Sequence, residues 1–348
     1  MENRRGELIP ELMPGLEPEL FTQLDEHMRR YVCDAHGDME LYRMMAFQMG
    51  WSEHRGREGA TSSKSRLYGQ TVLAARIALG GEAGEADLWR ATAMELMWHF
   101  YLVHNDIHEA NTEHHERASL WWQWGPSQAI NTGDGLHAMS RLALFNAFGT
   151  PPTPGLQGAL QLFDTTILRL CEGGYLDIDT QERLDVKEDT YFDIAARIDG
   201  GLLGCALGLA VAEHGDERLM DALRGYGELI GTARRVRRDA DALWGERRGD
   251  DLGALITKRK TLPVVHVLNG ADLKSKRRLA ELYAQRVVSV QALEEVAAIT
   301  ADAGARERCE GARRELATRA EERLAGLDKA RRKVIMVIGE RFEEMDTQ

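Results

Sequence analysis

The densest run of polar side chains lies between residues 104 and 117, directly after the apolar and aromatic stretch 96–103. In a helix, Asn105, Glu109 and Glu113 recur at i, i+4 and i+8, so they stay near one face with Asp106 beside them. Oxygen ligands of this kind suit Mg²⁺, which proteins hold through a few carboxylates together with substrate phosphates. The pattern predicts a metal site at the end of an apolar wall. The alternative, an exposed acidic helix end, is the commoner outcome for an isolated acidic run.

A second candidate is a basic cluster made of Arg234, Arg235, Arg237 and Arg238, which Asp239 follows directly. Guanidinium groups match phosphate oxygens in geometry, so the cluster predicts binding of a phosphate-containing substrate. A guanidinium also repels a metal ion that a neighbouring carboxylate would otherwise bind. The competing interpretation is a set of surface arginines paired with acidic residues on nearby helices.

The segments that must position these residues carry helical rather than alternating periodicity. Expected helices cover residues 86–110, 127–147, 155–173, 187–213, 216–246, 274–285, 290–303 and 306–345. The pairs Gly80-Gly81 and Gly173-Gly174 are predicted to end helices, because glycine adopts the left-handed conformation found there. No segment resembles a β-hairpin or a βαβ unit. The sequence therefore predicts an all-α bundle, a fold that can bury a pocket along its axis.

Composition narrows the class of protein further. The 348 residues are 43% hydrophobic and 29% charged, enough for a sizeable core, and the net charge of -12 disfavours binding to nucleic acid. The four cysteines are far apart and form no CxxC pair, which argues against a zinc knuckle and fits a reducing compartment. No segment has the features of a signal peptide or of a membrane span. We therefore expect a cytoplasmic protein without membrane insertion.

Several segments, in the right order, resemble the polyprenyl synthetase family, the trans-isoprenyl diphosphate synthases. Residues 104–136 resemble the first aspartate-rich region of this family, and residues 227–245 fall where it keeps the second. Residues 258–264 resemble its Lys-Thr-Leu-Pro segment, while 170–177 and 191–197 match the intervening helices. The resemblance covers about residues 60–270. It implies one isoprenoid-synthase-type domain over 1–348, with a central prenyl-binding cavity and 306–345 as a carboxy-terminal helix.

The resemblance also implies roles for individual residues. The expected catalytic residues are Asp106, Glu109 and Asp239. The expected Mg²⁺ ligands are Asn105, Asp106, Glu109, Glu113 and Asp239. The expected diphosphate-binding residues are Arg117, Arg234, Arg235, Arg238 and Lys260. The expected prenyl pocket contains Trp98, Phe100 and Tyr101, whose bulk implies a short prenyl group, although core packing is the commoner fate of such rings.

The departures from the family pattern are as informative as the matches. The Asp-Asp-x-x-Asp motif becomes Asn105 to Glu109, and the paired aspartates of the second motif become Arg238-Asp239. The Phe-Gln pair before that motif becomes Arg234-Arg235, and a Lys-Thr pair becomes Ile198-Asp199. In the element for isopentenyl diphosphate, a lysine falls on Ser65 and an arginine on Tyr68. These losses argue against ordinary elongation with that substrate.

Three functions remain compatible with the sequence. In the first, an Mg²⁺-dependent enzyme ionises a short allylic prenyl diphosphate and then cyclises or transfers the prenyl cation, as terpene synthases or prenyltransferases do. In the second, a catalytically inactive homologue acts as a regulatory subunit or partner of an active prenyl diphosphate synthase. In the third, the chain elongates prenyl diphosphates with the displaced Lys64, Arg66 and Arg117. The resemblance implies a homodimer, or a heterodimer with another prenyl synthase.

Overall fold

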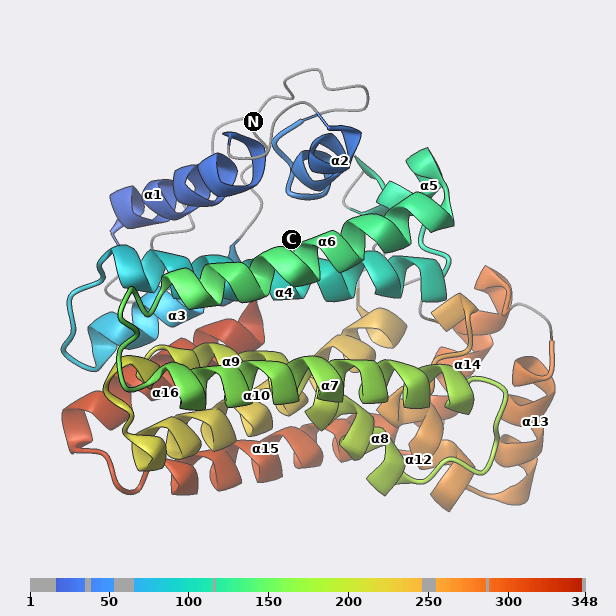
Figure 1. Ribbon diagram of the computed structural model, residues 1–348. Coiled ribbons are helices and arrows are strands. Elements are labelled where there is room, and N and C mark those ends of the chain that lie inside the picture. Colours follow the sequence, from blue (N-terminus) through green and yellow to red (C-terminus); the bar gives the residue numbers. More distant parts are fainter. Residues whose placement is uncertain are drawn as a thin grey trace, which may run out of the picture.

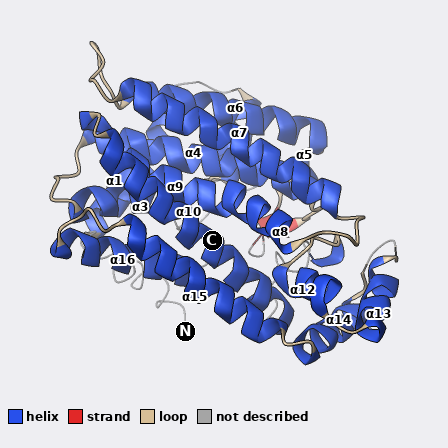
Figure 2. Cartoon of the chain, turned by 90° about the horizontal axis from the view of Figure 1, so that it is seen from below, coloured by secondary structure: helices blue, strands red, loops and turns tan. Residues whose placement is uncertain are grey.

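The computed structural model describes residues 17–34, 39–52, 66–114, 117–245, 255–285 and 288–345. Its first elements are α1 (Pro18–Arg29), η1 (Arg30–Asp34), α2 (Glu40–Gln48), α3 (Leu67–Ala78), α4 (Glu85–His108), β1 (Glu113–His114), β2 (Arg117–Ala118), α5 (Leu120–Trp124) and α6 (Pro126–Asn146). They continue with α7 (Leu156–Thr180), α8 (Glu188–Ala195), η2 (Ala196–Gly200), α9 (Gly201–Leu209), η3 (Ala212–His214), α10 (Glu217–Trp244), α12 (Leu262–Gly270), α13 (Leu273–Tyr283), α14 (Val290–Asp302), α15 (Ala305–Arg323) and α16 (Lys329–Glu344). The described chain is thus overwhelmingly helical, as Figures 1 and 2 show.

The helices form two groups packed on each other. In the view of Figure 1, α4 and α6 run side by side above, while α7, α10 and α15 lie below them. Between the groups, α9 contacts α10, α7, α3 and α4. All nine residues of α9 are buried, and its sequence is apolar on every side, as expected of a helix that water does not reach. The largest core cluster therefore spans both groups.

Glycines let α10 approach α9 and η2 closely. A Cβ atom at Gly227 would lie 2.7 Å from the Cα of Gly204, and one at Gly231 would lie 2.3 Å from the carbonyl oxygen of Asp199. Any larger residue at either position would force the helices apart, at a cost of about 1–3 kcal/mol. This close contact fixes the position of Asp199 relative to the carboxy-terminal half of α10.

The long helix α10 takes part in each of the three buried clusters of the described chain. Its first half contributes Leu223 and Ile230 to the large cluster, Val236 belongs to the cluster with α8, α12 and α15, and Leu243 belongs to the cluster with α12, α13 and α14. One continuous helix thus connects all three. The expectation of a single domain over residues 1–348 remains a prediction that this connection supports.

The prediction of one helix over 306–345 is wrong. The chain instead forms α15 and α16, separated by a turn at residues 324–328. The Asp328 side chain accepts hydrogen bonds from the backbone N–H groups of Ala330 and Arg331, both at 3.0 Å, and so caps the start of α16. The turn is marked in the sequence only by the uncharged stretch Leu324-Ala325-Gly326-Leu327, which helical periodicity alone does not separate from the flanking helices.

Gly173-Gly174 does not end a helix, contrary to prediction, because α7 continues to Thr180. A Cβ atom at Gly173 would lie 2.6 Å from a side-chain carbon of Ile198, so this glycine serves close packing against η2. By contrast, Gly80 has a φ of +88° and follows the end of α3 as predicted. One short antiparallel pair, β1 with β2, was also not expected. Among the described helices, none combines the length and the hydropathy that a membrane-spanning segment requires.

Candidate functional site

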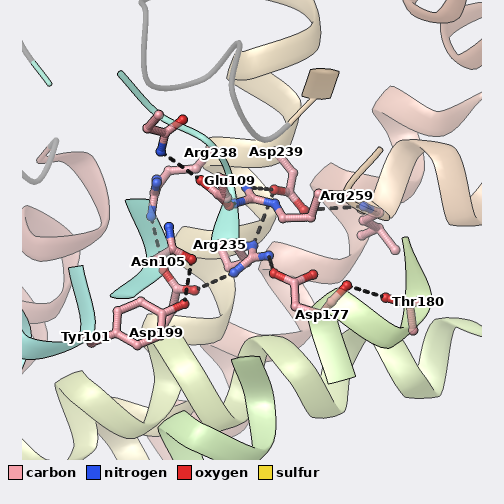
Figure 3. A network of polar contacts seen from close by, with 12 residues as sticks. Tyr101, Asn105, Glu109, Asp177, Thr180, Asp199, Arg235, Arg238, Asp239 and Arg259 are labelled. Atoms are coloured by element: carbon pink, nitrogen blue, oxygen red, sulfur yellow. Dashed lines mark hydrogen bonds and ion pairs between the residues drawn. The ribbon is translucent and has the colours of Figure 1, made fainter. Parts of the chain in front are cut away.

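Acidic and basic side chains from five segments meet in one network of polar contacts (Figure 3). They come from the end of α4, the carboxy-terminal part of α7, η2, the second half of α10, and the segment that precedes α12. We call these residues the ion-pair network: Glu109, Asp177, Asp199, Arg235, Arg238, Asp239 and Arg259. Every side chain in it except Arg238 is buried.

A tight turn at the end of α4 places Glu109 in this network. Ala110 has a φ of +51°, and the N–H of Asn111 donates to the carbonyl oxygen of Asp106 at 2.9 Å, which ends the helix in a left-handed cap. The amide of Asn111 also donates to Oε2 of Glu109 at 3.1 Å. The turn and this hydrogen bond together hold the Glu109 carboxylate toward the interior.

Arg259 connects the end of α4 to α10. One of its guanidinium nitrogens donates to Oε1 of Glu109 at 2.8 Å, and the other donates to Oδ1 of Asp239 at 3.2 Å. The second oxygen of Asp239 accepts from the backbone N–H of Leu262, the first residue of α12, at 3.4 Å. The two regions with predicted metal ligands are therefore brought together, with a guanidinium between them.

Arg235 is the second centre of the network. It donates to Asp199 at 3.0 Å and to Asp177 at 3.3 Å, and its Nε lies 3.4 Å from Asp239. Arg238, one turn further along the helix, donates to the other oxygen of Asp199 at 3.3 Å. In the described part of the chain, the network thus pairs four carboxylates with three guanidinium groups.

These pairings keep most of the buried groups charged. Burial raises the pKa of Glu109 and Asp199, but nearby arginines outweigh it and the pKa of each carboxyl is below its ordinary value. Burial also opposes the charge of Arg259, yet Glu109 and Asp239 hold its pKa above the ordinary range. Asp177 is the exception: burial raises its pKa despite Arg235 and Arg259.

The other predicted metal ligands lie in different surroundings. Asp106 is on the last turn of α4 and only 1% exposed, while Asn105 accepts a hydrogen bond from the Tyr101 hydroxyl at 3.4 Å. Glu113 is exposed on β1. The prediction that Glu113 continues the helical face of Asn105 and Glu109 is wrong, because α4 ends at His108. Its role as a ligand stays a prediction.

Three predicted diphosphate-binding residues make contacts outside the ion-pair network. Arg234 donates twice to the carbonyl oxygen of Met345 and stacks over Phe342, so it holds the end of α16. Arg117 donates to the carbonyl oxygens of Phe47 and Ser52. Lys260 donates to the carbonyl oxygen of Gln181 at 2.5 Å and lies over the Tyr283 ring.

The predicted pocket aromatics lie at the core side of α4. Trp98 is between Tyr68 and Tyr101, with ring centroids 5.3 and 6.0 Å away, and Phe100 packs against His104 and His137. Trp98 and Tyr101 are only partly buried. The Tyr101 hydroxyl donates to the side chain of Asn105, one turn further along α4, as Figure 3 shows.

Arg259, Asp177 and Asp199 were not among the predicted site residues. Arg259 lies between Lys258 and Lys260, the two lysines of the segment that resembles the Lys-Thr-Leu-Pro element. Asp199 departs from the Lys-Thr pair of the family, and Asp177 ends a segment that resembles an intervening helix. One signal could have identified Asp199: it and Arg235 have opposite charges, and both positions depart from the family pattern.

Comparison with known proteins assigns the family. The model of the family described as polyprenyl synthetase matches residues 64–300. The chain belongs to the polyprenyl synthetase family. A geranylgeranyl diphosphate synthase of Mycobacterium tuberculosis is 32% identical over 248 residues, which cover 70% of this chain and 69% of that protein. A (2E,6E)-farnesyl diphosphate synthase of Mycobacterium bovis is 26% identical over 84% of this chain and 77% of its own.

Solved structures of family members share the fold. A polyprenyl synthetase from Streptomyces coelicolor A3(2) superposes with a TM-score of 0.82 at 24% identity, over 96% of this chain and 99% of that one. A geranylgeranyl pyrophosphate synthetase from Pyrococcus horikoshii gives a TM-score of 0.79 at 21% identity, over 98% and 99%. The predicted all-α, isoprenoid-synthase-type fold is confirmed.

The Mg²⁺ ion that the family resemblance implies does not fit the arrangement of Glu109 and Asp239. All four of their carboxylate oxygens already accept a hydrogen bond, from Arg259, Asn111 or the N–H of Leu262. Among the residues that the structure describes, no three His, Cys, Asp or Glu side chains are placed to hold one metal ion. Mg²⁺ therefore stays a prediction that rests on the resemblance alone.

Proposed function

We propose that the chain is a prenyltransferase-class enzyme that binds a short allylic prenyl diphosphate and ionises it, for cyclisation or for transfer to an acceptor other than isopentenyl diphosphate. One observation carries this proposal: Glu109 and Asp239, from the two regions that resemble the aspartate-rich motifs, meet around Arg259 at one end of the bundle. The named relatives are synthases of geranylgeranyl and farnesyl diphosphate, which supports a prenyl diphosphate as substrate.

The diphosphate group would lie against the exposed edge of the ion-pair network. Arg238 is the network residue with accessible surface, its side chain being 30% exposed. A phosphate oxygen would there compete with Asp199 for the guanidinium, and a fork of N–H donors can hold both. Once bound, the fixed arginines would stabilise the negative charge that develops on the departing diphosphate. Arg117, Arg234 and Lys260 remain proposed contributors through their positive charge.

The hydrocarbon part would extend along α4 toward Trp98, Phe100 and Tyr101. These rings are bulky and close together, which supports a short prenyl group. The π face of an aromatic ring also stabilises a cation, so Trp98 and Tyr101 are suited to a prenyl carbocation. Of the other residues considered for elongation, Arg66 is bound to Asp25 and to the carbonyl oxygen of Met49, and Lys64 lies outside the described residues.

A second function, that of a catalytically inactive partner of another prenyl diphosphate synthase, has one observation in its favour. The four carboxylates of the ion-pair network outnumber its three guanidinium groups, so the described network does not attract an anion by net charge. On this alternative, the internal carboxylates keep the guanidinium groups, and the diphosphate does not exchange with Asp199. If this exchange does not occur, the chain would bind prenyl groups weakly or not at all.

One experiment separates these functions and elongation. The purified protein is incubated with C10, C15 and C20 allylic diphosphates, with and without isopentenyl diphosphate and Mg²⁺, and the products are identified by mass. The proposed enzyme releases diphosphate from an allylic substrate alone and forms a hydrocarbon, alcohol or prenylated acceptor. A longer diphosphate that requires isopentenyl diphosphate identifies an elongating enzyme instead. No turnover, combined with a changed product length when an active synthase is added, identifies the inactive partner.

We also propose that the chain forms a homodimer through α6 and α7. Both helices expose large apolar side chains, among them Leu142 and Phe145 on α6 and Leu168 and Tyr175 on α7. Scattered apolar residues are common on surfaces, but several on two helices that face the same side in Figure 1 are typical of an interface. Sedimentation velocity of the wild type and of a Leu168→Glu variant tests this, because the charge should shift the protein to monomer.

A further inference from the structure

We propose that Arg259 acts as a fixed internal cation between α4 and α10, occupying the position at which a divalent metal ion would otherwise neutralise Glu109 and Asp239. Its two guanidinium nitrogens lie 2.8 Å from a Glu109 oxygen and 3.2 Å from an Asp239 oxygen. The planar guanidinium spans two carboxylates in the way that a bridging metal ion spans its ligands, but it is covalently attached. This inference concerns the protein without substrate, so it holds for an active enzyme and for an inactive partner alike.

The charges around Arg259 disfavour binding of a divalent cation beside it. Arg235 approaches the same Asp239 oxygen to 3.4 Å, so two guanidinium groups share one carboxylate. A metal ion at this point would lie within a few ångströms of both guanidinium groups, and like charges repel strongly at that distance in a buried site. Metal binding would therefore require Arg259 to leave.

The backbone holds both ends of the bridge in place. The two non-glycine residues with positive φ in the described ranges are Ala110, at +51°, and Lys258, at +66°. The first directly follows Glu109 and the second directly precedes Arg259. A left-handed conformation is unfavourable for residues with a Cβ atom, and it persists where the surrounding structure determines it. The chain on each side of the bridge is thus built to present these two side chains to each other.

A latent metal site follows from this arrangement. Replacing Arg259 by an uncharged residue removes the guanidinium that joins Glu109 to Asp239 and leaves both carboxylates buried, with Arg235 alone still beside Asp239. Oxygen ligands in this state should take up a divalent cation from solution. Conservative replacement by lysine keeps the positive charge and should not create the site.

The test is binding of Mn²⁺ to the full chain without substrate, followed by electron paramagnetic resonance of the free ion. Wild type and Arg259→Lys should show no saturable binding beyond that of the matched control, Arg278→Gln, which removes an exposed arginine on α13. Arg259→Gln should bind Mn²⁺ at least tenfold more tightly than the wild type does. The double variant Arg259→Gln/Glu109→Gln should lose this gain, which locates the ion.

Two results would overturn the inference. If the wild type binds Mn²⁺ as tightly as Arg259→Gln, Arg259 does not exclude the metal ion. If Arg278→Gln gains as much Mn²⁺ affinity as Arg259→Gln, the gain reflects net charge alone. If Arg259→Gln does not fold, as judged by circular dichroism, the wild-type titration still decides: saturable Mn²⁺ binding that is lost in Glu109→Gln contradicts the inference, and its absence, with thermal stability unaffected by a chelator, supports it.

Discussion

Asp199 and Arg235 form a buried ion pair of 3.0 Å across 36 positions of sequence. Both positions depart from the family pattern, which has threonine at the first and glutamine at the second. In the folded chain the two departures compensate each other, since an acid and a base replace two neutral polar residues at one contact. They are therefore one structural change, and together they place charge where the family keeps neutral groups.

A double-mutant cycle measures this compensation. Arg235→Gln should lower the free energy of unfolding by about 3–5 kcal/mol, because it leaves Asp177, Asp199 and Asp239 without their shared guanidinium. Combining it with Asp199→Thr should cost about 1–3 kcal/mol less than the sum of the single variants. Urea unfolding provides the values. The exposed pair Arg278 and Glu295 serves as a control that should show no measurable coupling, and additive costs for the buried pair would refute the compensation.

Asp106 tests the assignment of the site. Asp106→Ala should abolish release of diphosphate from the preferred allylic substrate, since a buried carboxylate at the end of α4 is lost. Asp106→Asn keeps the shape of the side chain and should reduce the rate by about a hundredfold or more. Asp302→Ala, on an exposed position of α14, provides the control. Unchanged turnover in the Asp106 variants would show that the site lies elsewhere.

Lys260 should make anion binding depend on pH. Burial lowers the pKa of this amine to about 8, although Glu182 opposes the shift. The charged form therefore predominates below about pH 8 and is lost above it. Affinity for pyrophosphate, measured by calorimetry, should fall from pH 7 to pH 9 more steeply in the wild type than in Lys260→Arg, which keeps its charge. Identical profiles for the two proteins would remove Lys260 from the anion-binding residues.

Glu95 should make stability depend on pH in the opposite sense to an ordinary carboxylate. Burial raises its pKa to about 7, against Arg66 and a hydrogen bond from the N–H of Gly69. The folded protein then binds more protons than the unfolded chain between pH 4.5 and 7, so the contribution of Glu95 is complete below pH 4.5 and lost as pH rises through about 7.

The free energy of unfolding of Glu95→Gln, relative to that of the wild type, should therefore rise between pH 5 and pH 8. The difference should be about 3 kcal/mol at most, since each unit of pKa corresponds to about 1.4 kcal/mol. Urea unfolding at the two pH values measures this difference. Glu294→Gln, at an exposed position of α14, is the control for loss of charge. A difference that does not change with pH would mean that Glu95 is ionised throughout this range.

Gly231 should be required for the contact between α10 and η2. Gly231→Ala places a Cβ atom 2.3 Å from the carbonyl oxygen of Asp199, which neither helix can avoid without moving. We expect a loss of about 1–3 kcal/mol in the free energy of unfolding. Gly174→Ala on α7, which meets no atom within 4 Å, should instead stabilise by about 0.5–1 kcal/mol. Equal effects at the two positions would contradict the close packing described here.

The sequence alone determined the helical class and the order of the segments. Periodicity located most helices, because the apolar side of each must face a core, and the ordered resemblance over residues 60–270 indicated how they are arranged. It also predicts Glu109 and Asp239 for one site, and the structure brings both residues into contact with Arg259. Turns are predicted less well: periodicity does not separate the turn before the cap at Asp328 from its flanking helices, and Gly173 serves packing rather than termination.

Only the tertiary structure decided what each charged residue contacts. Arg234 and Arg235 are neighbours in one predicted cluster, yet side chains turn by about 100° per residue in a helix. Arg234 therefore meets the end of α16, while Arg235 meets three buried acids. Arg259, far from both in sequence, completes the network because α12 packs beside α10. Local spacing fixes the direction of a side chain on its helix, but packing between helices decides whether that direction leads to solvent, to a carbonyl group or to a carboxylate.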